Sequence, residues 1–207
     1  MSVAPERLSG WLEGFAARHG RPAVEADAGH VRLVAPDGAE ARIRLAWGPL
    51  DTDEPLAELV AAYTLPRRIG ALIVRRQAHA VGVFDGDTLV AGRHGSHYVQ
   101  GRTKAGGWSQ QRYARRRANQ AGRAFEAAAA DAASVLLPEV DHMEALVTGG
   151  DRAGVLAVLA EPGLERLADP ALRRGFGTFA VPDPNARVLA GFATGFRAVP
   201  IELNELA

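Results

Sequence analysis

One long helix places the strongest constraint on how this chain can fold. The pattern predicts it from Gln111 to Leu137, where Pro138 ends it. Its first half is rich in arginine, whereas Phe125 to Val135 is alanine-rich and apolar. The two halves therefore need different neighbours: we expect the second half to pack on a sheet and the first half to face a ligand.

The residues around this helix alternate between strand and helix patterns, which is typical of an α/β (α+β) fold with a mixed sheet flanked by helices. Asp85-Gly86-Asp87 has the composition of a hairpin turn. Thr148-Gly149-Gly150-Asp151 is interpreted as a structural turn, with Asp151 capping the helix that follows. The expected strands are 69–75, 78–84, 88–93, 97–102, 143–147, 176–181 and 201–203, and the further helices are 152–160 and 184–199.

The first residues have a different pattern and predict a small αβββ unit. An amphipathic helix over 5–19 comes first, and a linking helix is expected over 54–63. Pro66 closes this part, so the expected domains are 1–66 and 67–207. The three strands of the small unit are expected over 23–28, 30–35 and 40–47.

Composition excludes several classes of protein. There is no cysteine, so disulfide frameworks and thiolate metal sites are excluded. No cationic start with an apolar core opens the chain, and no apolar run reaches the roughly 20 residues that span a bilayer. We therefore expect a cytoplasmic protein without a membrane partner.

Charge is distributed unevenly although the net charge is zero. No Asp or Glu lies between Thr88 and Phe125, whereas the first 65 residues contain ten acids and six arginines. A local basic field of this kind favours RNA phosphates, although a solvated basic face is the alternative. The residues expected to bind RNA are Arg102, Lys104, Arg112, Arg115, Arg116, Arg117 and Arg123.

A polar loop over 103–110 precedes the helix and is the candidate catalytic segment. Gly106 and Gly107 allow backbone angles that other residues avoid, and Ser109 and Gln110 offer a hydroxyl and an amide. The alternative is a flexible connector in which Ser109 is the N-cap of the helix. The acid-free stretch on both sides favours the functional interpretation.

Two other constellations are not favoured. His94 and His97 have the spacing of metal ligands, but no third ligand follows, so no metal is expected. Ser109, His97 and Asp85 could be assembled as a triad, yet the chain has no Gly-x-Ser-x-Gly nucleophile elbow. No cofactor is expected.

The Gly-Gly-x-Ser loop followed by Arg112-Tyr113-Ala114-Arg115-Arg116-Arg117 resembles the catalytic middle domain of archaeal and eukaryotic class-1 release factors. There, a Gly-Gly-Gln loop precedes a similar arginine-rich helix. The closest resemblance is to the actinobacterial branch of Vms-like release factors (VLRF), and it covers residues 69–203. Trp108 occupies the place of the release-factor glutamine, and the amide follows at Gln110, a displacement that is similar in the Vms-like branch.

The resemblance implies a metal-independent peptidyl-tRNA hydrolase that releases nascent chains from stalled ribosomes or large subunits. It implies that Gln110 positions water, with Gln111 as the rival, and that Gly106, Gly107 and Ser109 shape the loop. The implied partners are the large ribosomal subunit and peptidyl-tRNA. The alternatives are a tRNA 3′-end endonuclease of the Vms-like type and a non-catalytic ribosome-binding or RNA-binding rescue factor.

Overall fold

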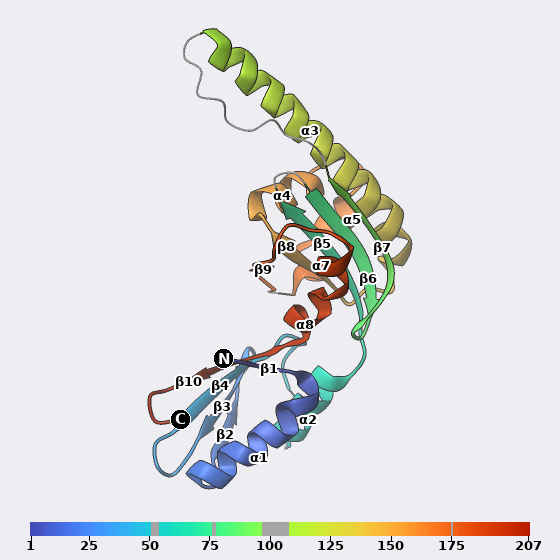
Figure 1. Cartoon of the computed structure of the whole chain (residues 1–207). Helices are drawn as coiled ribbons and strands as arrows, with labels where there is room; N and C mark the ends of the chain where they lie inside the picture. Colours follow the sequence, from blue (N-terminus) through green and yellow to red (C-terminus); the bar gives the residue numbers. More distant parts are fainter. Residues whose placement is uncertain (51–53, 76–77, 97–107, 175) are drawn as a thin grey trace. The chain divides into compact units, whose positions relative to one another are not determined.

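The computed structural model describes residues 1–50, 54–75, 78–96, 108–174 and 176–207, and of residues 108–121 only the helical backbone (Figure 1). These residues form two compact units. The first comprises Met1–Pro66 and Thr194–Ala207, and the second comprises Arg67–Ala193. Each unit has its own sheet and its own hydrophobic core.

The first unit is an antiparallel sheet with an apolar face and an ionic face. Its elements are β1 (Ser2–Val3), a 3-10 helix (Pro5–Arg7), α1 (Leu8–His19), β2 (Ala23–Ala26), β3 (His30–Val34), β4 (Glu40–Arg44), α2 (Pro55–Thr64) and β10 (Val199–Leu203). The strand order is β1-β10-β4-β3-β2. Leu33 and Ile43 alternate inward and pack with Phe15 of α1, each at most 1 % exposed. On the other face, Arg32 pairs with Glu40 at 2.8 Å and with Glu25 at 3.3 Å.

The closing strand lies in a different sheet from the one expected. β10 pairs with β1 and β4, and Ile201 lies opposite Ile43. Val199 and Ile201 are at most 1 % exposed and belong to the core of the first unit. Residues 194–207 therefore lie in the first unit, and the expected interval 67–207 differs from the second unit at its C-terminal end.

The second unit is built on a mixed sheet, as expected. Its order is β7-β6-β5-β8-β9, in which β5, β6 and β7 are antiparallel neighbours and β8 runs parallel to β5 and β9. Gly86 has a φ of 61° in the turn between β6 and β7, so the predicted hairpin is confirmed. The strands are β5 (Arg68–Arg75), β6 (Ala78–Asp85), β7 (Thr88–Ser96), β8 (Ala145–Gly150) and β9 (Thr178–Phe179).

Helices flank this sheet, so the predicted mixed α/β architecture is confirmed. They are α3 (Trp108–Leu136), a 3-10 helix (Leu137–Glu139), α4 (Arg152–Leu159), α5 (Glu165–Ala168), α6 (Pro170–Arg173) and α7 (Ala186–Ala190). A further helix, α8 (Phe192–Arg197), begins in the second unit and ends in the first. The helix expected over 184–199 is divided at Gly191, a residue with low helix propensity. The strand expected over 97–102 lies outside the described residues.

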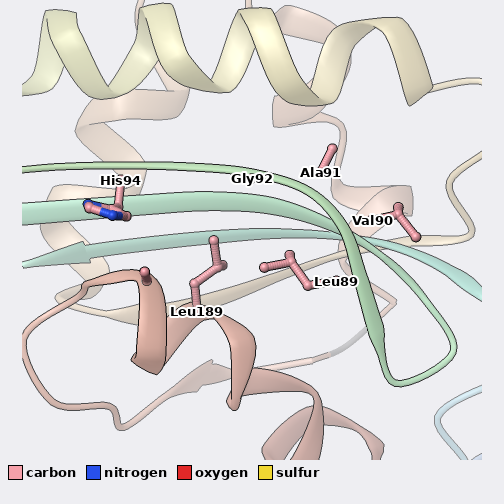
Figure 2. Close-up of a pocket in the computed structure, with 7 residues that line it drawn as sticks. Leu89, Val90, Ala91, Gly92, His94 and Leu189 are labelled. Carbon is pink, nitrogen blue, oxygen red and sulfur yellow. The ribbon is translucent and has the colours of Figure 1, made fainter.

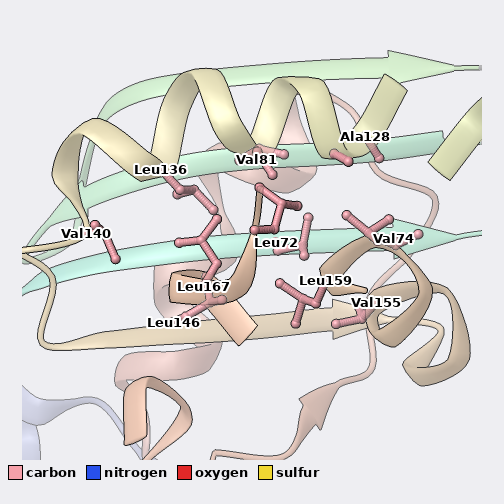
Figure 3. Close-up of a cluster of buried hydrophobic side chains, with 14 of the residues drawn as sticks. Leu72, Val74, Val81, Ala128, Leu136, Val140, Leu146, Val155, Leu159 and Leu167 are labelled. Carbon is pink, nitrogen blue, oxygen red and sulfur yellow. The ribbon is translucent and has the colours of Figure 1, made fainter. Parts of the chain in front are cut away.

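The core of the second unit lies between one face of the sheet and α3 and α4 (Figure 3). Alternate residues of β5 and β6 point to this face, and the alanine-rich half of α3 covers them. The helix has small side chains there, so it can approach the strands closely. The central residues are Leu72, Val74 and Val81 from the strands, Ala128, Ala132 and Leu136 from α3, and Val155 and Leu159 from α4.

The junction between β8 and α4 requires glycine at position 150. Gly150 has a φ of 89°, and a Cβ added there would lie 2.2 Å from the carbonyl oxygen of Val74. The same carbonyl accepts a hydrogen bond from the backbone N–H of Asp151 at 2.7 Å. Asp151 also caps α4 by accepting from the N–H of Ala153 at 3.1 Å, so its predicted capping role is confirmed.

Replacing Gly150 with alanine should destabilise the protein by about 2 kcal/mol or more, because the substitution combines an unfavourable φ with a clash against backbone. Gly122→Ala is the matched control, since nothing lies within 4 Å of the Cβ site and Gly122 lies inside α3. There alanine should stabilise by roughly 0.5–1 kcal/mol. Denaturant unfolding measures both changes, and equal stability of the two variants would contradict this account of the junction.

Candidate functional site

The predicted loop over 103–110 begins between β7, which ends at Ser96, and α3, which begins at Trp108. Four of the predicted site residues lie outside the described part of the chain: Arg102, Lys104, Gly106 and Gly107. The helix begins three residues earlier than expected, so Ser109 and Gln110 lie in its first turn and not in a loop. The first backbone N–H groups of a helix have no acceptor within it, so Gln110 lies beside available donors.

The C-terminal half of α3 has one buried side and one exposed side. Successive residues of an α-helix are turned by about 100°, which places the exposed Arg123, Glu126, Ala130 and Ser134 along one line. The buried residues lie on the opposite side and face the sheet; they are Ala124, Ala128, Ala132 and Leu136.

The predicted arginines extend the exposed side toward the start of the helix. By backbone register, Arg112, Arg115 and Arg116 fall with Arg123 in an arc of about 100°, on the side turned away from the sheet. Arg117 falls about 100° beyond the edge of this arc. We call Arg112, Arg115, Arg116 and Arg123 the arginine face; it unites four of the seven predicted RNA contacts.

The helix is too long for the sheet to cover. α3 has 29 residues and is about 44 Å long, whereas the eight residues of β6 extend over about 27 Å. Among the residues of α3 whose side chains the structure describes, Ala124 is the first that is buried, and Phe125 packs against the core. Figure 1 accordingly shows the N-terminal half of α3 continuing past the strands. The first half of the helix, with Gln110 and most of the arginine face, therefore projects from the sheet.

Arg123 is the member of the arginine face whose side chain the structure describes. Its side chain is exposed. An exposed guanidinium is accessible to a phosphate.

A polar cluster that sequence reasoning missed fixes the other half of α3. The Nε2 of His79 on β6 lies 2.8 Å from Oδ2 of Asp131 on α3, and Nη1 of Arg93 on β7 donates to Oδ1 at 3.3 Å. His79 is only 3 % exposed. Asp131 is the one acid between Ala127 and Leu137, and a charge within a buried alanine run was the signal available in the sequence.

The cluster keeps Asp131 ionised. Burial raises the pKa of its carboxyl group, but the hydrogen bonds from His79 and Arg93 outweigh burial, and the net effect lowers the pKa. A carboxylate at this position is therefore charged at neutral pH and serves as a double acceptor.

A shallow pocket lies against the other face of β7 (Figure 2). Its volume is about 190 Å³, and His94 is the ionisable residue that lines it. The rest of its lining is apolar or backbone, mainly Leu89, Val90 and Leu189. It has the chemistry of an incompletely filled packing gap.

The other constellations considered from the sequence fall partly outside the described residues, since both involve His97. Within the described ranges, no group of three or more His, Asp or Glu is placed to hold a metal ion. No helix in these ranges is long and apolar enough to cross a bilayer.

Two solved structures of archaeal proteins resemble the chain. The crystal structure of the archaeal translation termination factor aRF1 has a TM-score of 0.38 and 13 % identity, over 76 % of this chain and 46 % of that one. A second, described as an archaeal protein, has a TM-score of 0.39 and 14 % identity, over 77 % and 48 %. The chain therefore spans less than half the length of either. No curated protein matches it.

The second unit matches a known family. The profile of the Actinobacteria/chloroflexi VLRF1 release factor family (acVLRF1) covers residues 67–202, which is more than half of the chain. The matched range begins where the second unit begins and includes Gln110 and the arginine face. The resemblance inferred from the loop and the arginine-rich helix is thus confirmed, and the chain belongs to the Actinobacteria/chloroflexi VLRF1 release factor family.

Proposed function

We propose that this protein is a peptidyl-tRNA hydrolase that acts in translation and releases nascent chains from stalled ribosomes or large subunits. The observation that carries the proposal is the projecting half of α3, which has Gln110 in its first turn and arginines along the side turned away from the sheet. Membership of a release factor family supports a ribosome-associated role for this helix.

The proposed chemistry is hydrolysis of the ester between peptide and tRNA. It requires a water molecule held near the carbonyl carbon and donors for the developing oxyanion. The amide of Gln110 both donates and accepts hydrogen bonds without titrating, and backbone N–H groups at the start of α3 are further donors. Gly106, Gly107 and Ser109 give this segment the small, polar character that close approach to an RNA-lined cavity requires.

The arginine face has the proposed role of binding rRNA or the acceptor arm of tRNA. Its arginines repeat at helical spacing, so they can contact successive phosphates along one backbone. Arg102, Lys104 and Arg117 would add to the same basic field. The ribosomal large subunit and peptidyl-tRNA are the proposed partners.

Gln110→Ala should slow peptide release from purified stalled complexes by about 100-fold or more, which is typical of losing one group that stabilises an oxyanion. Binding to the ribosome should not change, because the arginines remain. Gln120→Ala is the matched control, since it removes the same amide from the same helix ten residues later. Gln111→Ala tests the rival glutamine, which is turned by about 100° from Gln110.

The outcomes separate three functions. Release that depends on Gln110, with tRNA of full length, supports the hydrolase. Release of tRNA shortened at its 3′ end would instead identify an endonuclease. If the wild-type protein binds the ribosome but releases no peptide, it is a non-catalytic rescue factor.

Charge reversal on the arginine face should weaken ribosome binding. Arg115→Glu combined with Arg116→Glu should lower affinity in co-sedimentation and flatten the slope of log affinity against log salt by roughly 1 to 2. Arg173→Glu combined with Arg187→Glu is the control with the same charge change on α6 and α7. Equal loss in both double variants would show that net charge, and not this face, governs binding.

A further inference from the structure

Three elements meet at Asp131. Its two carboxylate oxygens accept from different strands: Oδ2 is 2.8 Å from Nε2 of His79 on β6, and Oδ1 is 3.3 Å from Nη1 of Arg93 on β7. Asp131 itself lies on α3. The cluster therefore ties the helix to two adjacent strands at a single side chain.

The backbone of β7 is adapted to the imidazole of His79. Gly95 lies directly opposite His79 in the sheet, and a Cβ at Gly95 would lie 2.6 Å from Cε1 of the ring. Only a residue without a side chain leaves this space free. The imidazole is thus held between β7 and α3, where it is 3 % exposed.

The same two elements flank the candidate site. β7 ends at Ser96, the chain passes through 97–107, and α3 begins at Trp108. Asp131 and Arg93 therefore join the two flanks of the segment that contains Gly106 and Gly107. The apolar contacts of α3 in this region, such as those of Phe125, Ala128 and Ala132, are not directional. Hydrogen bonds depend on angle, so the cluster restrains rotation and tilt of the helix more than the alanines do.

Because α3 is long, a small change in its tilt at Asp131 displaces its N-terminal end by a large distance. Gln110 lies 21 residues before Asp131, or about 32 Å along the axis of α3. A tilt of about 10° at Asp131 would then displace Gln110 by about 6 Å, which exceeds the tolerance of a catalytic group for its substrate.

We propose that His79, Asp131 and Arg93 are positioning residues that set the direction of the projecting half of α3, and hence the place of Gln110 in the ribosome. The catalytic consequence of this proposal rests on the function proposed above. The effect of the cluster on the direction of α3 does not depend on that function. The cluster touches no substrate and acts through α3.

The geometric part is tested by distance measurements between spin labels. The chain contains no cysteine, so Thr88→Cys on β7 and Ala118→Cys on α3 introduce the only labelling sites. Adding Asp131→Asn should broaden the distance distribution at least twofold. Arg93→Gln alters an exposed member of the cluster and should broaden the distance distribution less. This variant provides the test if Asp131→Asn does not fold. Glu139→Gln is the control, because it breaks the 3.0 Å ion pair with Arg68 at the other end of α3.

An unchanged distance distribution in folded Asp131→Asn would overturn the proposal. If Asp131→Asn does not fold, an unchanged distribution in Arg93→Gln would overturn it. Equal broadening by Glu139→Gln would also overturn it.

The catalytic part is measured from release rates at saturating protein. Asp131→Asn should lower the rate constant at saturation about tenfold, because saturation removes any effect on binding through the arginines of the same helix, whereas mere loss of folded protein lowers only the active fraction. If the wild-type protein releases no peptide, the proposed hydrolase fails while the distance measurements still decide the role of the cluster.

Discussion

The packing of the alanine-rich half of α3 on β5 and β6 is the interaction on which the second unit depends. Leu72 and Val81 of the strands and Leu136 of the helix are fully buried there. Because α3 is longer than the strands, this contact holds one half and leaves the other to project. The division between apolar and basic residues along one helix therefore produces both the core and the candidate site.

The sequence predicts those parts of the fold that local patterns determine. Asp85-Gly86-Asp87 separates β6 from β7 and has the composition of a turn, and Asp151 has the chemistry of a cap, so these positions follow from residue type. The partners of β10 could not be predicted in this way. The alternation of Val199 and Ile201 is compatible with a strand in either sheet, and β10 pairs with β1 and β4, which are remote in sequence.

The candidate site also has a part that local patterns predict and a part that depends on the fold. Helical spacing predicts that Arg112, Arg115 and Arg116 share one side, and the register of α3 adds that Arg117 does not. The Asp131 cluster escaped prediction because its partners are remote, with His79 52 residues away and Arg93 38 residues away. A lone acid in an alanine run indicates that some partner exists, but the fold decides which residue it is.

The distribution of charge differs between the first unit and the projecting helix. In the first unit, acids and bases are paired with each other, as in His19 with Asp37 and Arg197 with Glu6. In α3, no acid precedes Glu126, so arginines three and four residues apart repel one another and weaken the helix by a few tenths of a kcal/mol per pair. A polyanion along the arginine face would remove this repulsion. On the proposed function, binding of ribosomal RNA would therefore stabilise the helical turns that include Gln110.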